Sequence, residues 1–187
     1  MTMSTFKRVA VTARSLCRGD FLSQIEKIIP CTDMIILREK DLPYDEYLEL
    51  ARKVRSLCEG TGTQLVLHFY TSAARELGHD AIHLPLGKFL EESENLGDFT
   101  IRGVSVHSVS EAVEAWKAGA TYLTAGHVFR TDCKKDLEPR GLQFLEDVCR
   151  AVPIPVYALG GINDETETEV RKTSAAGACR MSWYMQM

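Results

Sequence analysis

The sequence lacks the features that would assign it to a membrane, secreted or multidomain class. No apolar run approaches the roughly 18 residues of a membrane-spanning helix. The first 15 residues have no apolar core followed by a small-residue cleavage site, so we expect no signal peptide. No Pro/Gly/Ser-rich linker and no repeat divides the chain. We therefore expect a single domain over residues 1–187 that is not embedded in a membrane.

Basic character and paired cysteines are also missing. The net charge is −4, and no helix-turn-helix or finger pattern is present, which argues against binding to nucleic acid. The six cysteines are spread along the chain, with no Cys-x-x-Cys pair and no ligand-like spacing to histidines. We expect free thiols in a reducing cytoplasm, without disulfides or zinc.

What the sequence does contain is an alternation of short apolar runs with amphipathic segments. The runs predict eight strands, over residues 6–12, 33–38, 64–69, 81–84, 101–107, 122–125, 156–159 and 177–181. The segments between them predict seven helices, of which the clearest begins after Pro43 and ends at Gly60. Strict β/α alternation implies parallel strands with right-handed crossovers. Eight such units predict an α/β fold, the (β/α)8 TIM barrel.

The end of the chain departs from this pattern. Residues 182–187 (SWYMQM) leave too little length for a full eighth helix, so we expect the last helix to be missing or truncated. Two explanations are open. Either a neighbouring subunit covers strands 8 and 1, which predicts a homodimer, or the natural C-terminus has been lost.

One stretch, residues 122–141 (YLTAGHVFRTDCKKDLEPRG), carries the first candidate for chemistry. It places His127 just beyond a strand end, where barrel enzymes collect their reactive groups, so its imidazole is a candidate acid/base. Thr131 and Lys134 follow in a charged loop suited to an anionic substrate. The alternative is a solvated loop with a surface histidine.

A phosphate site is predicted after the last two strands. Gly160 and Gly161 follow the seventh strand and precede a helix capped by Asn163, so their backbone N–H groups can approach an oxyanion. Ser182 follows the eighth strand and adds a hydroxyl. Loops 7 and 8 form the common phosphate site of such barrels. A plain turn between strand and helix is the alternative.

Other polar residues end strands at the same mouth. Arg38 ends the second strand, where it can hold a second anionic group bidentately, and a salt bridge to Glu39 or Asp41 is the alternative. Ser105 and His107 share one side of the fifth strand, and Ser105 is predicted to touch ligand.

Two more histidines are expected to serve packing. His68 and His83 have no nearby carboxylate at metal-binding spacing, and we expect both to pack in the core or at the rim. The predicted mouth offers few of the carboxylates that a magnesium ion needs. We therefore predict no metal site and no cofactor.

Seven segments together resemble the thiamine phosphate synthase and TenI-type thiazole tautomerase family. They run nearly end to end and are VTA from Val11, ILREK from Ile36, AIHLP from Ala81, GVSVHS from Gly103, AGHVFRTDCKK from Ala125, PIPVYALGGI from Pro153 and AGACRMS from Ala176. The resemblance implies the barrel fold already expected from the alternation of elements.

The resemblance also implies an activity. The synthase branch joins a pyrimidine pyrophosphate to a thiazole phosphate, using magnesium held by an Asn-Asp pair after the third strand and an Asp after the fourth. Here those positions are His68, Phe69 and Lys88. The tautomerase branch lacks the metal ligands and moves a proton with the histidine that matches His127. The resemblance therefore favours an isomerase of thiamine biosynthesis, which aromatises a 2-carboxythiazole phosphate tautomer without a cofactor.

Site residues carry over by motif. Gly160, Gly161 and Ser182 match the substrate phosphate site, and Arg38 and Lys134 match anion-contacting positions of the synthase. Two alternatives are kept. The first is a thiamine phosphate synthase, a transferase that would need Mg²⁺. The second is a non-catalytic protein that binds thiazole phosphate, with a regulatory role.

Overall fold

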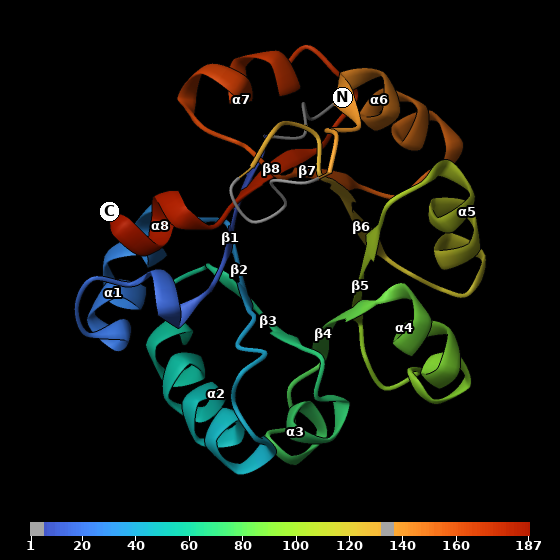
Figure 1. The fold of residues 1–187 in the computed structure, drawn as a ribbon. Helices are drawn as coiled ribbons and strands as arrows, with labels where there is room; N and C mark the ends of the chain where they lie inside the picture. Colours follow the sequence, from blue (N-terminus) through green and yellow to red (C-terminus); the bar gives the residue numbers. More distant parts are fainter. Residues whose placement is uncertain (1–5, 132–136) are drawn as a thin grey trace.

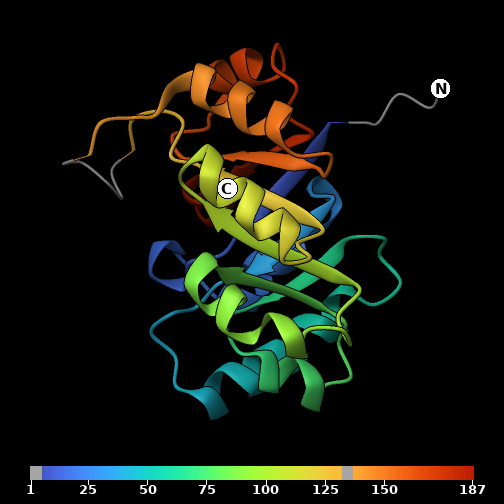
Figure 2. The same ribbon diagram turned by 90° about the vertical axis from the view of Figure 1, so that its right-hand side faces the viewer.

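Eight parallel strands close into a barrel, with the helices outside the ring (Figures 1 and 2). The computed structural model describes residues 6–131 and 137–187. The strands are β1 Lys7–Val11, β2 Met34–Leu37, β3 Gln64–His68, β4 Ala81–Pro85, β5 Ile101–Val106, β6 Tyr122–Gly126, β7 Val156–Leu159 and β8 Gly177–Arg180. The helices are α1 Phe21–Ile28, α2 Tyr44–Cys58, α3 Thr71–Glu76, α4 Leu86–Glu92, α5 Val109–Lys117, α6 Gly141–Ala151, α7 Asp164–Val170 and α8 Ser182–Gln186. The predicted (β/α)8 barrel is confirmed.

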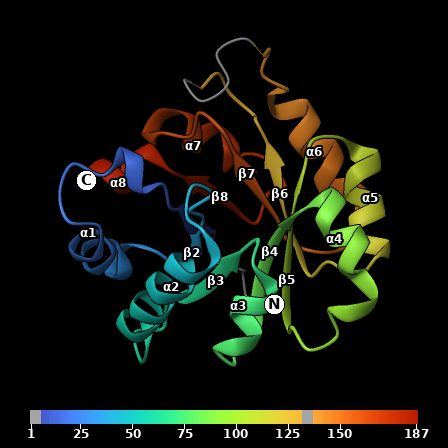
Figure 3. The same ribbon diagram turned by 60° about the horizontal axis from the view of Figure 1, so that its bottom comes forward.

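The last helix is present in shortened form. α8 has five residues, and it buries Tyr184 and Met185 against the barrel. The Gln24 side chain of α1 donates a hydrogen bond of 2.6 Å to the Tyr184 carbonyl, which ties α8 to α1 (Figures 1 and 3). The prediction of a truncated last helix is confirmed, whereas the homodimer stays a prediction. None of the described helices combines the length and apolar character needed to cross a membrane.

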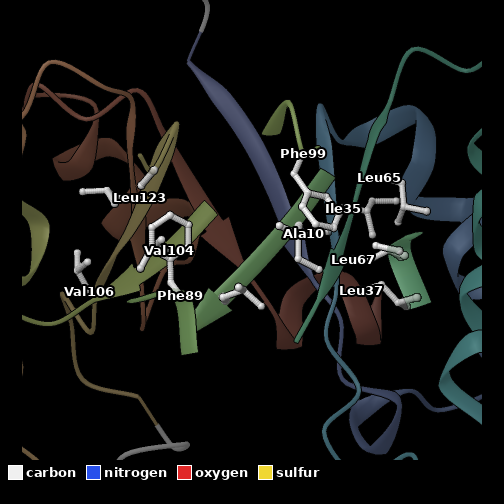
Figure 4. Close-up of a cluster of buried hydrophobic side chains, with 14 of the residues drawn as sticks. Ala10, Ile35, Leu37, Leu65, Leu67, Phe89, Phe99, Val104, Val106 and Leu123 are labelled. Atoms are coloured by element: carbon white, nitrogen blue, oxygen red, sulfur yellow. The ribbon is translucent and has the colours of Figure 1, made fainter. Parts of the chain in front are cut away.

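Alternation along each strand divides the apolar residues into two groups. Ile35 and Leu65 face outward and pack with the helices (Figure 4). Ile36 and Val66, which are neighbours in the register of β2 and β3, belong to a second cluster inside the barrel. Side chains on the inward positions therefore fill the barrel from below. Where inward positions become polar, near the carboxyl ends of the strands, the interior opens.

A buried tyrosine fixes the carboxyl ends of two neighbouring strands. The Tyr47 hydroxyl donates to the Leu37 carbonyl at the end of β2 and accepts from the backbone N–H of His68 at the end of β3, both at 2.8 Å. Tyr47 is only 1% exposed, and burial raises the pKa of its phenol. This hydroxyl holds the two strand ends at a set separation.

Replacing Tyr47 by Phe is expected to destabilise the fold by about 1–3 kcal/mol, because it leaves a buried carbonyl and a buried N–H without partners. Urea denaturation measures the change. Tyr44→Phe is the matched control on the same helix. Its hydroxyl bonds Glu76 at the exposed surface, so a change of under about 0.5 kcal/mol is expected. Equal losses in both variants would contradict the role given to Tyr47.

Candidate functional site

A cavity of about 370 Å³ lies at the carboxyl ends of the strands. The structure brings together seven of the residues predicted from sequence, all of which line this cavity: Arg38, Ser105, His127, Thr131, Gly160, Gly161 and Ser182. Lys134, the eighth, falls outside the described residues. Loops that are distant in sequence therefore meet at one mouth, as parallel strand ends require.

Positive charge enters the cavity from the segment after β2. Arg38 and Lys40 both line it, and no carboxylate side chain is among the described residues of its wall. The intervening Glu39 is 3% exposed and turns elsewhere, accepting hydrogen bonds from the Thr12 hydroxyl at 2.6 Å and the Arg14 N–H at 2.9 Å. Burial raises the pKa of Glu39, an effect that these hydrogen bonds partly offset. The charged wall is therefore suited to anions.

The turn after β7 brings backbone close to the cavity. Gly160 and Gly161 have φ angles of +99° and +67°, which favour glycine. The Gly160 carbonyl accepts from Phe129 N–H at 3.1 Å, so this turn is joined to the loop after β6. Asn163 caps α7 by accepting from the N–H groups of Glu165 and Thr166. Those two donors face the cap, which leaves the glycine turn itself as the place where an anion can meet backbone N–H groups.

Two histidines at the rim are held by backbone carbonyls. A ring nitrogen of His107 (Nδ1) lies 2.7 Å from the Gly126 carbonyl oxygen. His127 Nε2 lies 3.2 Å from the Leu137 carbonyl oxygen, and the residue is 5% exposed. His127 thus reaches the cavity wall with one nitrogen already in a hydrogen bond. Its assignment as a catalytic residue stays a prediction.

The floor of the cavity is a hydrogen-bonded polar layer inside the barrel. His83 Nδ1 meets the Tyr122 hydroxyl at 2.9 Å, and His83 Nε2 meets the Ser105 hydroxyl at 2.8 Å. The Thr124 hydroxyl donates to Ser105 at 3.2 Å. Gly103 makes room for this layer, since a methyl group there would overlap the Tyr122 ring and His83. Ser105 is therefore anchored within the floor.

His68 lies beside His83 in the same layer. Their rings are stacked, with centroids 5.9 Å apart and planes inclined by 20°. Burial is the main cause that lowers both pKa values, that of His68 to about 2 and that of His83 to about 3, and the Arg38 charge adds to each effect. Both imidazoles are neutral at physiological pH.

The magnesium that the synthase branch implies does not fit the residues here. The positions of its ligands carry His68, Phe69 and Lys88, of which Phe69 is 41% exposed with Lys88 Nζ 4.8 Å from its ring centroid. A hard cation needs oxygen ligands, and these positions supply none. Across the part of the chain that the structure describes, no group of three or more His, Cys, Asp or Glu residues is placed to hold a metal. We assign no step to a metal.

Sequence reasoning missed several residues of the cavity wall, of which three are polar groups near its centre or its cationic side. His68 and His83 were expected to serve packing, and Lys40 was not singled out, yet all three line the cavity. Strand alternation could have found the histidines, because each lies two residues after an inward apolar residue, Val66 or Ala81. What alternation does not reveal is which inward polar residues pair with one another.

The closed parallel barrel and the cation-lined mouth are typical of α/β-barrel enzymes that act on phosphorylated small molecules. A family model described as thiamine monophosphate synthase matches residues 8–183. The chain belongs to this family.

Individual relatives and a solved structure support the same family. The chain is 34% identical over 179 residues to "Putative thiamine-phosphate synthase 2" of Aquifex aeolicus, covering 95% of this chain and 96% of the relative. It is 32% identical over 176 residues to "Thiamine-phosphate synthase" of Clostridium acetobutylicum, covering 92% and 83%. The solved structure of a thiamine phosphate pyrophosphorylase from Pyrococcus furiosus superposes with a TM-score of 0.82 at 30% identity, covering 97% of this chain and 88% of that one.

These comparisons correct the predicted activity. The expectation of a thiazole tautomerase, an isomerase of the TenI branch, is wrong, because the relatives and the solved structure bear synthase names. The prediction gave three altered positions more weight than similarity along the whole barrel. Those positions show that the metal ligands are replaced, which bears on how anions are held and does not by itself define another reaction.

Proposed function

We propose that this chain is a thiamine-phosphate synthase, which joins a pyrimidine pyrophosphate to a thiazole phosphate and releases pyrophosphate. The observation that carries the proposal is the synthase identity of relatives that match over nine-tenths of the chain. The cavity supports it, because both substrates and the leaving group are anions and the described wall carries cations without carboxylates.

Each anion has a candidate place. Arg38 and Lys40 would hold the pyrophosphate and stabilise the negative charge that develops as it leaves. The turn at Gly160 and Gly161, together with Ser182 of the same cavity wall, would hold the phosphate of the thiazole. We also expect the protein to work in the cytoplasm, where free thiols such as the buried Cys58 and Cys179 persist.

Direct measurement of thiamine phosphate formation tests the proposal. The two substrates are incubated with the protein, once with Mg²⁺ and once with a chelator, and product is quantified by chromatography. Product is expected in both conditions. Arg38→Met is expected to lower kcat/KM by about 10–100-fold through loss of charge-assisted hydrogen bonds. Arg52→Met, which removes an exposed arginine of α2, is the control and is expected to leave the rate unchanged. Absence of product in both conditions would refute the proposal.

A second candidate is favoured by the replaced metal ligands. A protein that binds thiazole phosphate without turnover needs the anion site and no seat for magnesium. The same assay, paired with calorimetric titration of thiazole phosphate, separates the two. Binding without product would favour the second candidate.

A further inference from the structure

The imidazole of His68 belongs to a largely buried side chain and has no hydrogen-bond partner among the residues that the structure describes. His68 is 4% exposed and lines the cavity. Its backbone N–H donates to Tyr47 and its carbonyl accepts from Tyr70 N–H at 2.9 Å. Within residues 6–131 and 137–187, neither nitrogen of its ring has a hydrogen-bond partner. Arg14 Nε is the one side-chain nitrogen or oxygen of the described residues that is both fully buried and unpaired, so the His68 ring nitrogens are accessible from the cavity, where a ligand can meet them.

The neighbouring histidine does not satisfy it. Both nitrogens of His83 are engaged, one with Tyr122 and the other with Ser105. His83 therefore meets His68 through its ring face. The stack and the two backbone hydrogen bonds at His68 hold the ring in place while its nitrogens stay available to the cavity.

The charge state limits what the ring can bind. Burial and the nearby Arg38 and Lys40 charges lower its pKa, so the ring is neutral. A neutral imidazole offers one N–H donor and one lone-pair acceptor. It is poorly suited to a phosphate, which the cationic rim already serves. It suits the polar edge of an uncharged heterocycle, and the adjoining wall is apolar at Val11, Ile36 and Cys179.

We propose that His68 contacts the heteroaromatic ring of a phosphorylated ligand, with a hydrogen bond from its imidazole to the ring edge and His83 as the stacked support behind it. His68 is then a specificity-determining residue at a position where the synthase branch carries a metal ligand. The inference rests on the proposed function only for the choice of thiazole phosphate and thiamine phosphate as probes.

Calorimetric titration of three probes tests the proposal: inorganic phosphate, thiazole phosphate and thiamine phosphate. The wild-type protein is expected to bind at least one ring-bearing probe more tightly than inorganic phosphate. His68→Leu, which removes both nitrogens, is expected to weaken that binding by about 2–10-fold and to leave inorganic phosphate binding unchanged. His68→Gln retains one donor and one acceptor and is expected to recover most of the loss.

The matched control is His79→Leu. The His79 ring nitrogen Nε2 lies 3.0 Å from the Leu65 carbonyl oxygen, and this residue is not part of the cavity wall. Its replacement is expected to leave all three affinities unchanged. Circular dichroism confirms that each variant is folded. If His68→Leu does not fold, His68→Gln and nitrogen-detected NMR of the wild-type histidine rings decide instead, since ring-bearing probes should shift the His68 nitrogens and inorganic phosphate should not.

Several outcomes would overturn the proposal. One is that the wild-type protein binds neither ring-bearing probe more tightly than inorganic phosphate. Another is that His68→Leu weakens the binding of all three probes equally. A third is that the NMR signals of the His68 ring nitrogens do not shift when a ring-bearing probe is added. Failure here is distinguishable from failure of the proposed function. Thiamine phosphate formation at the wild-type rate in His68→Leu would remove the role of His68 and keep the synthase. Ring-selective binding without product would support the role of His68 and refute the synthase activity.

Discussion

Gly160→Ala is expected to destabilise the fold by about 2–5 kcal/mol and to abolish measurable phosphate binding at the glycine turn. Two costs combine at this position. The backbone at φ +99° is unfavourable for any residue with a Cβ. In addition, the new methyl group would overlap the Cβ of His127 and lie 2.8 Å from its Cα. Relief of that overlap must move either the turn or the histidine, and both line the cavity.

Gly119→Ala separates these costs. Gly119 has almost the same φ, +100°, but a methyl group there would meet nothing within 4 Å. It is therefore expected to lose only about 1–2 kcal/mol and to keep phosphate binding intact. Urea denaturation and calorimetric titration of inorganic phosphate measure the two effects. If Gly160→Ala is no less stable than Gly119→Ala, or binds phosphate normally, the packing of the turn against His127 is not what shapes the site.

The fold could be predicted from sequence because each strand carries its own evidence. The run 122–125 predicted a strand that the structure gives as β6 Tyr122–Gly126, and the weak run 177–181 corresponds to β8 Gly177–Arg180. Buried parallel strands are short apolar runs bounded by turns, so neither needed long-range information. Closure of the barrel was predicted from the number of strands, eight, and the pairing of β1 with β8 confirms it.

The candidate site could be predicted from the sequence only in part. Residues just after strand ends, such as Arg38 and Gly160, could be predicted, because parallel topology brings all those ends to one mouth. The polar floor of the cavity could not be predicted, because it depends on hydrogen bonds between residues far apart in the sequence. His83 and Tyr122 are separated by 39 residues, and nothing local to either shows that they bond. The unpaired state of His68 emerges only once those partners are known.

Arg180 is a charged residue within the run 177–181 that predicts the eighth strand. In the structure it ends β8 and lines the cavity, and its guanidinium donates to Asp164 at 2.7 Å and to Glu167 at 2.5 Å, both from α7. Its charge is therefore balanced between strand and helix, and it joins α7 to the barrel beside the glycine turn.

Acid is expected to destabilise the protein at a pH above that at which its carboxylates titrate. His68 and His83 have pKa values of about 2 and about 3 in the folded state, against 6.5 for an ordinary histidine. Below pH 6.5 these two histidines become protonated in the unfolded chain but stay neutral in the folded chain. Stability then rises with pH, or equally is lost as pH falls from about 6.5 toward 3. His79, whose pKa is also lowered by burial, acts in the same direction.

The expected size is large relative to a typical stability of about 5–15 kcal/mol. Each buried histidine contributes roughly 1.4 kcal/mol per pH unit once the unfolded chain is protonated, so the pair amounts to roughly 5 kcal/mol at pH 4.5. Glu39, with its raised pKa, opposes part of this loss, because the folded state then binds its proton more readily. Asp33, with a lowered pKa, adds to the loss only at lower pH.

Urea denaturation at pH 7, 6, 5.5, 5 and 4.5 measures the effect. The free energy of unfolding should fall with a slope approaching roughly 2.7 kcal/mol per pH unit between pH 5.5 and 4.5. His68→Leu should remove about half of that slope, because only His83 of the stacked pair then remains to be protonated on unfolding. A flat profile between pH 7 and 5, or an unaltered slope in His68→Leu, would mean that the stacked imidazoles accept protons within the folded barrel and that the floor of the cavity is better solvated than its burial implies.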